Sequence, residues 1–315
     1  MHLYLQIDMS TYGHLGKCFH FFGVDGVVQR EPVEELENNH DEADTIIYLH
    51  AEIIYEVGAD NIIIRAADTD IAVMLLHHSD KLEAKLWMDV GTIGKNDRWY
   101  IPLSAIASSL GTGICAALPG FHAFTGCDHT SAFVRKGKGR PLALVEKDVE
   151  IQKVFEQLAT DTNVNESTHT HLETFTATVY DTKTKCALNE YQHCIFKRAF
   201  APKARAAHPL MKLQGIDGSS LPPCQAELRP HTKRAAFFAR MWGKATQQRI
   251  VQHPVASDGW AMEDGSYSIT WFEGPQLPED LVPSDDDDDV SGDDSSDDMN
   301  LSSDDEPEEL SSEED

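Results

Sequence analysis

A short β-branched run that follows directly on a segment of helical spacing constrains the fold of this chain more than any other feature. Residues 42–57 carry apolar side chains on one stripe of a helix, and Gly58 predicts where that helix stops. The stripe consists of Ile46, Ile53, Ile54 and Val57. Residues 61–65, Asn-Ile-Ile-Ile-Arg, show no polar alternation, which is typical of a strand covered on both faces. A helix between strand-like segments predicts a βαβ unit, a parallel sheet and an α/β fold.

Five acids at three separated places surround this junction. They are Glu42 and Asp44 at the head of the helix, Asp68 and Asp70 just past the strand, and Asp128 in a Gly-Cys-Asp turn. Ligands of parallel sheets gather at the carboxyl ends of the strands. Converging carboxylates repel one another by roughly 3 kcal/mol per pair at ~5 Å and an effective dielectric constant of ~20. A fold keeps such a cluster mainly where hard cations neutralise it, and oxygen ligands suit Mg²⁺ or Mn²⁺.

The spacing within each acid pair bears on whether the acids share one site. Asp68 and Asp70 point to the same side of an extended backbone. Glu42 and Asp44 lie about 200° apart on a regular helix, so both reach one site only if Glu42 lies in an irregular first turn. Otherwise one acts through water, and Asp41 competes for the same face. Taken singly, Asp68 is more often a helix N-cap and Asp44 a first-turn acid, but the three places together favour a shared metal site.

These motifs resemble those of a nuclease superfamily. The order Glu-Ala-Asp on a helix, Asp-Thr-Asp after a strand and Phe-Thr-Gly-Cys-Asp resembles the PIN-like nucleases of the flap-endonuclease branch over about residues 40–150. A closer resemblance, over about residues 15–282, is to a set of animal proteins with Glu-Ala-Asp-Thr, Asp-Thr-Asp and Thr-Gly-Cys-Asp motifs followed by Ser-Ala-Phe and a Lys-Gly run. In this chain those motifs occupy residues 42–45, 68–70, 120–128, 131–133 and 136–139.

The resemblance implies a phosphodiesterase that uses two divalent cations, Mg²⁺ or Mn²⁺, about 3.5–4 Å apart. One cation would activate water and the other would stabilise the leaving oxygen. By motif position the ligands, direct or through water, would be Glu42, Asp44, Asp68, Asp70 and Asp128. The implied fold is a PIN-like, mainly parallel sheet flanked by helices.

Nucleases of this kind usually carry a further acid after the first strand of the domain. The segment Leu3–Asp8 looks similar, but residues 15–45 match the stretch just before the Glu-Ala-Asp helix in the related chains. The resemblance therefore implies a domain that is incomplete at its N-terminus, and a parallel sheet without its first strand would expose apolar edges.

A glycine-rich basic segment, residues 134–140, follows the last acid closely. Glycines let a backbone approach a phosphate, and consecutive N–H groups form an anion-binding nest. Its bases would attract a DNA or RNA backbone without regard to sequence. They are Arg135, Lys136, Lys138 and Arg140. In the resembled branch a glycine-rich helical hairpin at this place grips duplex DNA, whereas the other reading is a solvated basic loop.

The remaining patterns predict a hairpin, short helices and a second hairpin. The predicted elements are strands at 86–90 and 98–103 around a turn at 91–97, a helix at 105–110 capped by Ser104, helices at 149–159, 170–180 and 231–248, and a turn with a small hairpin at 257–272. We therefore expect a partial N-terminal segment (1–40), a nuclease-like core (41–150), a mostly helical extension packed on it (151–283) and a disordered acidic tail (284–315).

The net charge of −27 is distributed unevenly. Residues 285–315 hold 17 acids and no Lys or Arg, which leaves 36 acids against 26 bases in the rest. Residues 197–249 hold eleven bases and two acids, with Phe237, Phe238 and Trp242 among them. Phe238 and Trp242 are expected to pack inward from one face of a helix, while the bases form either a nucleic-acid surface or a solvated face. The acidic tail, whose serines precede acids, is expected to bind this basic segment or basic proteins.

Cysteine and histidine spacing indicates no structural zinc site, because no Cys-x-x-Cys pair occurs among the six cysteines. His50 is expected in the core, and helix packing is the safer interpretation of His122, although His122 and His129 flank the acids. Neither a signal peptide nor an apolar run long enough for a membrane helix is evident. Unpaired thiols and the acidic tail favour a nuclear or cytoplasmic protein that is neither secreted nor membrane-bound.

Two functions follow as expectations. The first is a metal-dependent nuclease that hydrolyses phosphodiester bonds in DNA or RNA, with selectivity for substrate structure. The second is a catalytically degenerate nuclease fold that serves as a nucleic-acid or protein interaction module. The presence of all five motif acids favours the active nuclease. The missing first strand of the domain favours the interaction module.

Overall fold

The structure is a computed structural model of an α/β protein. It describes residues 19–24, 27–32, 34, 37–40, 42–56, 58–91, 99–160, 163–181, 187–200, 218–250 and 258–274. Residues 1–274 belong to one compact unit and residues 275–315 to another. The predicted acidic tail at 284–315 and residues 201–217 of the basic stretch at 197–249 lie outside the described residues.

The described strands form three small sheets. They are β1 (Phe19–Val24), β2 (Val27–Pro32), β3 (Asn61–Arg65), β4 (Lys85–Val90), β5 (Trp99–Pro102), β6 (Trp260–Glu263) and β7 (Ser266–Ile269). β1 and β2 pair antiparallel, as do β6 and β7. In the sheet of order β3-β4-β5, β3 runs parallel to β4 and β4 runs antiparallel to β5. Both predicted hairpins are confirmed, but the central described sheet is mixed and not mainly parallel, because β5 returns directly from β4.

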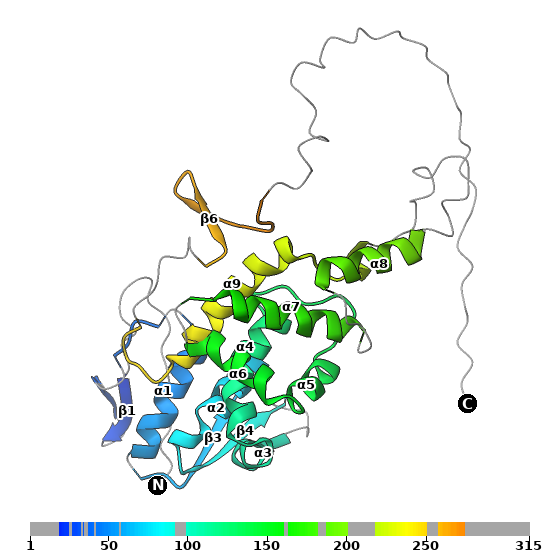
Figure 1. Ribbon diagram of the computed structural model, residues 1–315. Coiled ribbons are helices and arrows are strands. Elements are labelled where there is room, and N and C mark those ends of the chain that lie inside the picture. The colour runs from blue at the N-terminus through cyan, green and yellow to red at the C-terminus, as the bar shows by residue number, and fades with distance from the viewer. Residues whose placement is uncertain are drawn as a thin grey trace, which may run out of the picture. The chain divides into compact units, whose positions relative to one another are not determined.

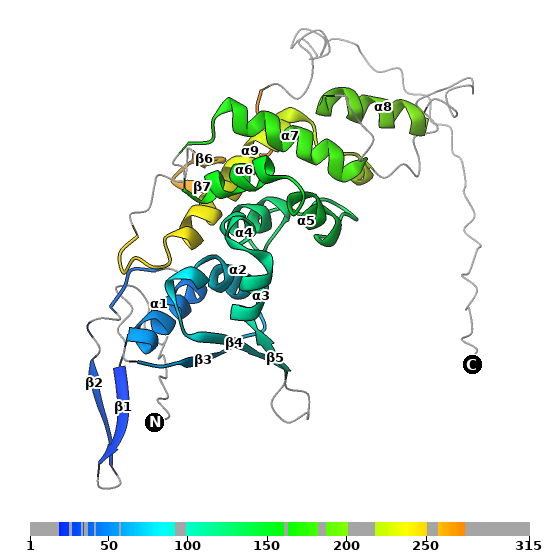
Figure 2. The ribbon, with the colours of Figure 1, turned by 60° about the horizontal axis from the view of Figure 1, so that its bottom comes forward.

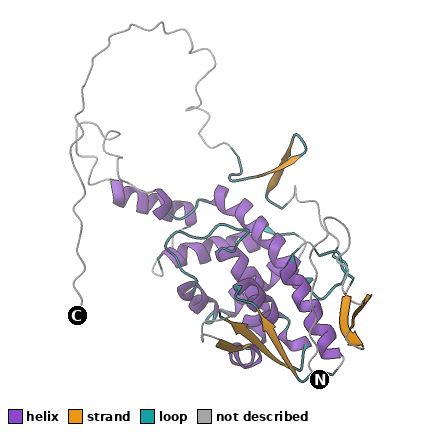
Figure 3. Ribbon diagram, turned by 180° about the vertical axis from the view of Figure 1, so that it is seen from behind, coloured by secondary structure: helices purple, strands orange, loops and turns teal. Residues whose placement is uncertain are grey.

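Helices make up the body of the described chain, with the strands at its margins (Figure 3). They are α1 (Ala43–Glu56), α2 (Thr69–His77), α3 (Leu103–Leu110), α4 (Thr112–Thr125), α5 (Gly139–Val145), α6 (Val149–Thr160), α7 (Glu166–Tyr180), α8 (Leu188–Phe200) and α9 (Gln225–Gly243). Gly58 ends α1 as expected, with a φ of +91° that favours glycine. α9 begins six residues before the predicted start at His231 and contains Pro230.

Only one face of β3 is buried. Ile62 and Ile64 are 4% and 7% exposed, whereas Ile63 is 59% exposed. Figure 2 shows α1, α2 and α3 together on one side of the β3-β4-β5 sheet. The expectation of a strand covered on both faces is therefore wrong for the described residues. Isoleucine favours extended backbone through its branched Cβ on either face of a sheet, so three in succession could not reveal which face is covered.

The core is centred on α4, which packs against α2, α6 and α9 (Figure 1). Rings from four segments meet there, with Phe124 lying 5.5 Å from Phe133 and Phe155 lying 5.1 Å from Phe175 between ring centroids. Gly120 lets the backbone of α4 approach that of α6, because a Cβ on Gly120 would overlap the backbone oxygen of Phe155. Such close helix contacts fix the position of the segment that follows α4.

Two buried histidines attach α9 to the earlier part of the chain. His78 Nε2 donates to the carbonyl of Trp242 at 2.9 Å, and His231 Nε2 donates to the carbonyl of Phe124 at 2.8 Å. Burial lowers the pKa of His78 to about 3 and that of His231 to about 4, so both rings are neutral near pH 7.

These histidines should make the protein acid-labile. Each ring binds a proton near pH 6.5 once the chain unfolds, but only near pH 3 or 4 in the folded state. Their stabilising contribution is therefore complete above pH 6.5 and is lost as the pH falls towards 4. For His231 the loss should approach about 3 kcal/mol, measured by urea unfolding across that pH range. His231→Gln keeps a donor but no titrating group, so it should flatten the profile; an unchanged slope would contradict this account.

Two further findings complete the fold. Ser104 does not cap α3 as predicted, because the helix already begins at Leu103; its hydroxyl instead accepts from the N–H of Leu86 at 2.8 Å. No single described helix is long and apolar enough to cross a membrane. The bent pair α3 and α4, with 105° between the two helices, meets the requirement by length and composition only.

Candidate functional site

Four of the five predicted acids lie at two neighbouring helix beginnings. Glu42 lies in a bend immediately before α1, outside the regular helix, and Asp44 lies in the first turn. This is the irregular geometry that lets both acids face one site. Asp68 is the N-cap of α2 and accepts from the N–H of Asp70 at 3.0 Å. The expectation of extended backbone through 68–70 is therefore wrong, since α2 begins at Thr69, and the N-cap reading of Asp68 is confirmed.

The two pairs of acids lie close enough to affect one another. The pKa of Asp44 is raised from 3.8 to about 6, chiefly by burial and then by the charges of Asp68, Glu42 and Asp70. His129 opposes this shift. The structure thus brings the head of α1 and the head of α2 together around Asp44, in a cluster whose negative charges repel.

Asp70 is engaged by a chain of two further polar groups. His122 Nε2 lies 2.7 Å from Asp70 Oδ1, and Lys138 Nζ lies 2.7 Å from His122 Nδ1. Because a carboxylate accepts and an ammonium donates, His122 carries its proton on Nε2 and accepts at Nδ1. Asp70 and His122 are 5% and 6% exposed. Burial lowers the pKa of Lys138, while the nearby charges of Cys127 and Asp70 oppose that shift.

The turn after α4 places its side chains on different sides of the site. His129 Nε2 lies 3.2 Å from Glu42 Oε1, and its ring stacks on Phe238 with centroids 4.5 Å apart and planes 10° apart. Burial raises the pKa of Cys127, and the charge of Asp70 contributes to that rise. Asp128 is exposed, and its charge is not among those that shift the pKa of Asp44.

The segment before α1 is held from the far end of the described chain. Asn39 exchanges two hydrogen bonds with Ile250, through its Nδ2 at 3.0 Å and its Oδ1 at 2.8 Å. His40 Nε2 donates to the carbonyl of Gln247 at 2.6 Å. Together with the stacking of His129 on α9, these bonds position the acidic head of α1.

The carboxylates of the cluster are of the ligand type that a divalent cation prefers, but their positions in the structure do not surround a cation. Carboxylate oxygens are the ligands that Mg²⁺ and Mn²⁺ prefer, and Asp68, Glu42 and Asp70 lie near enough to Asp44 to add to the rise in its pKa that burial chiefly causes. Within the described part of the chain, however, no three His, Cys, Asp or Glu side chains surround a common point as a metal ion requires. Glu42, Asp44 and Asp68 are near enough for charge coupling, Asp70 is bound by His122, and Asp128 is exposed.

The four basic residues that were predicted to bind nucleic acid separate into two groups. Arg135, which has a φ of +58°, is exposed on the segment between α4 and α5, and Arg140 is exposed in the first turn of α5. Lys136 lies over the ring of Tyr180, 4.5 Å from its centroid. Lys138 instead reaches inward to His122, so in this arrangement it belongs to the acid cluster and does not face a nucleic-acid backbone.

The bases of α9 are largely neutralised within the fold. Their partners are Glu166 for Arg229, Glu273 for Lys233, Asp258 for Arg240, and the carbonyls of Gly259 and Thr270 for Arg234. Trp242 is 1% exposed, which confirms that it packs inward. Phe238 is half-buried, so the expectation of inward aromatics is met fully only by Trp242. The expectation of a solvated basic face is wrong for Arg234 and Arg240, which are 3% and 4% exposed.

Sequence reasoning missed the roles of His122 and Lys138. Helix packing was the safer interpretation of His122, yet the residue bonds to Asp70 from the buried side of α4. The signal was its position one helical turn before the Gly-Cys-Asp turn, which places it on the same side as that turn. Lys138 gave no such signal, because only the path of the glycine-rich segment turns it inward.

Comparisons of the chain with protein-family models, curated proteins and solved structures found no match. The interpretation of the site therefore depends on its own geometry and charge.

Proposed function

We propose that residues 41–150 form a PIN-like, flap-endonuclease-like core and that the protein is a divalent-metal-dependent nuclease acting on DNA or RNA. One observation carries the proposal: Glu42, Asp68 and Asp70 converge on Asp44 closely enough to help raise its pKa to about 6. A carboxyl pKa raised by burial together with neighbouring acids is common at sites that use a charged ligand or perform chemistry. The bases Arg135, Lys136 and Arg140 lie on the segment that follows the acids and would attract a polyanion.

Glu42, Asp44 and Asp68 would hold the cation, with Asp70 positioned beside them by His122. When bound, Mg²⁺ or Mn²⁺ would polarise a phosphodiester oxygen and lower the pKa of bound water. The protein's own contribution is to hold the carboxylates in place: Asp68 through its cap on α2, and Glu42 through His129.

A cation site makes a prediction that needs no activity. The pKa of Asp44 is about 6 in the folded state and 3.8 ordinarily, so the charged carboxylate destabilises the fold increasingly as the pH rises from about 4 to 6. Asp44→Asn should therefore raise the melting temperature at pH 7.5 and have little effect at pH 4. Mn²⁺ should stabilise the wild-type protein at pH 7.5 and stabilise Asp44→Asn much less. Asp60→Asn, an exposed acid before β3, is the matched control and should change neither result.

Cleavage is tested with Mn²⁺ on flap, hairpin and single-stranded substrates. We expect cleavage by the wild-type chain and a loss of at least about a hundredfold in Asp68→Asn, because an ionic metal contact contributes several kcal/mol to the transition state. Asp60→Asn should retain the full rate. If Asp68→Asn cleaves the substrates as fast as the wild-type chain, the acids are not the catalytic site.

A second function is favoured by the bonding of Asp70. Its Oδ1 is committed to His122 and through it to Lys138, and no described trio of donors surrounds a common point. A degenerate nuclease fold that binds nucleic acid or protein without turnover fits those observations. It predicts DNA or RNA binding that survives Asp68→Asn, with no cleavage in any metal.

A further inference from the structure

A cavity of about 470 Å³ is lined in part by residues 131–134, in the same chain segment that carries His129 to Glu42 in the acid cluster. Its walls come from the segment that follows the Cys127 turn, the end of α7, residues 218–223 and α9. One segment therefore connects the two places, since it starts next to Glu42 and Asp70 and continues as Ser131–Val134 in the cavity wall. The volume is typical of sites that take small organic ligands.

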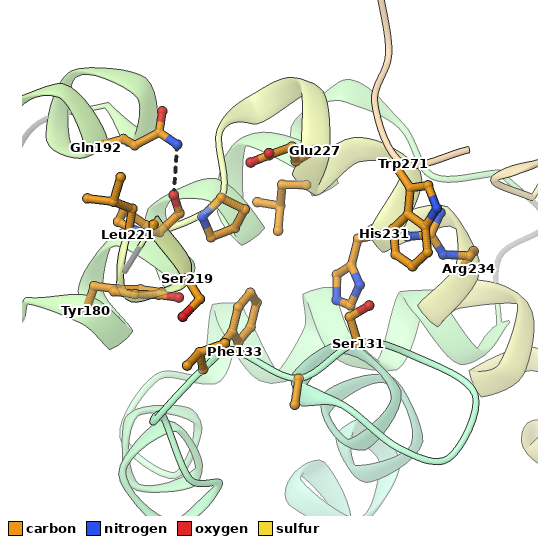
Figure 4. Close-up of a pocket in the computed structure, with 16 residues that line it drawn as sticks. Ser131, Phe133, Tyr180, Gln192, Ser219, Leu221, Glu227, His231, Arg234 and Trp271 are labelled. Carbon is orange, nitrogen blue, oxygen red and sulfur yellow. Dashed lines mark hydrogen bonds between the residues drawn. The ribbon is translucent and has the colours of Figure 1, made fainter. Parts of the chain in front are cut away.

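Aromatic rings paired with cations lie at both ends of the cavity. In Figure 4, Trp271 and Arg234 lie at one end and Tyr180 at the other, with Phe133 and His231 between them. The Arg234 guanidinium lies 5.3 Å from the Trp271 ring centroid and is fixed by the carbonyls of Gly259 and Thr270. The ammonium of Lys136 lies 4.5 Å from the Tyr180 centroid. Rings held in this way offer flat surfaces for stacking, with positive charge at hand for an anion.

Polar groups between the rings can pair with the edge of a ligand. His231 donates from Nε2 to the Phe124 carbonyl, which leaves its Nδ1 as an acceptor. The hydroxyls of Ser131 and Ser219 also line the cavity, and each can donate or accept. A purely apolar ligand would leave these groups unpaired, which costs free energy in a partly dehydrated cavity.

We propose that this cavity binds one nucleotide unit, with the base stacked against the aromatic side chains and the phosphate directed to the Lys136 end. The choice of ligand class rests on the proposed nucleic-acid function, whereas the cavity's ring faces, cations and hydrogen-bonding groups are independent of it. A planar heteroaromatic ring with polar edges and an attached anion satisfies all three kinds of group at once.

The test is binding of adenosine 5′-monophosphate and of a short oligothymidylate to the full chain in EDTA, measured by calorimetry and tryptophan fluorescence. We expect saturable binding by at least one of them; the mononucleotide arm reports a free nucleotide and the oligonucleotide arm a base within a strand. Trp271→Ala should weaken binding about tenfold, since stacking of a base on an aromatic side chain is worth ~1–3 kcal/mol. Trp99→Ala is the matched control, because Trp99 on β5 is 66% exposed and Trp271 is 60% exposed.

A second variant guards against misfolding. Ser131→Phe adds bulk at an exposed wall position and should abolish binding while the melting temperature stays unchanged. Any one of three results would overturn the proposal. Ribose 5-phosphate could bind as tightly as the nucleotide, a folded Trp271→Ala variant could keep wild-type affinity, or neither arm could show saturable binding. The wild-type chain, assayed for both binding and Mn²⁺-dependent cleavage, separates the two proposals: nucleotide binding without cleavage overturns only the nuclease, and cleavage without nucleotide binding overturns only the cavity proposal.

Discussion

Replacing Gly120 with alanine should lower the free energy of unfolding by about 3 kcal/mol or more. The new Cβ would overlap the backbone oxygen of Phe155 and lie 3.2 Å from the Cβ of Leu158, so α4 and α6 would have to separate. The higher helix propensity of alanine returns only about 1 kcal/mol. Urea unfolding followed by circular dichroism measures the loss.

Gly137 is the matched control for that substitution. It lies in the segment between α4 and α5, has no atom within 4 Å of an added Cβ, and is not among the glycines with positive φ. Gly137→Ala should therefore change stability by less than about 0.5 kcal/mol. If both variants unfold at the same urea concentration, the close approach of α4 to α6 does not hold in solution.

Lys138→Met should destabilise the fold by about 2 kcal/mol. The substitution leaves the Asp70 carboxylate buried beside His122 without the ammonium that neutralises its charge. Removing one partner of a fully buried pair costs about 3–5 kcal/mol. We expect less here because Lys138 itself is only half-buried. Asp70→Asn in the same chain should recover part of the loss, since the carboxylate that needed neutralising is gone.

Lys136→Met separates this effect from the loss of any lysine in the same segment. Lys136 is also half-buried, but its ammonium lies over the Tyr180 ring, and among the described residues it pairs with no buried acid. Its replacement should cost less than about 1 kcal/mol. Additive losses in the Lys138→Met and Asp70→Asn double variant would show that the two groups are not coupled through His122.

Local pattern predicted the elements well where one physical signal dominated. The helix after Glu42, the glycine that ends it and the hairpins predicted at 86–103 and 257–272 match the structure, because periodicity and turn residues are local properties. Of the predicted apolar stripe, Ile46 is buried, Ile53 and Ile54 are half-buried, and Val57 lies outside the described residues. The one-sided burial of β3 and the mixed sheet could not be read in this way. Both depend on which later segments return to cover or extend the sheet.

The site was predicted in part for the same reason. Glu42, Asp44, Asp68 and Asp70 were grouped by the expectation that helix heads meet strand ends, and the structure brings them together. Asp128 was grouped with them as an acid in a third, separate turn and by its motif position, but that turn directs Cys127 and His129 towards the acids while Asp128 is exposed. The direction of a side chain within a turn depends on backbone angles that residue types do not specify.

The bonds from Asn39 and His40 to residues 247–250, and the stacking of His129 on Phe238, decide how this protein can be divided in the laboratory. A fragment ending at residue 150 would contain all five acids but none of these contacts, and its core would lack the indole of Trp242. We expect such a piece to lack the arrangement of acids that the whole chain has, whatever the activity of the whole chain. Minimal expression versions should therefore retain the chain through residue 274, and a negative assay on anything shorter carries no information about catalysis.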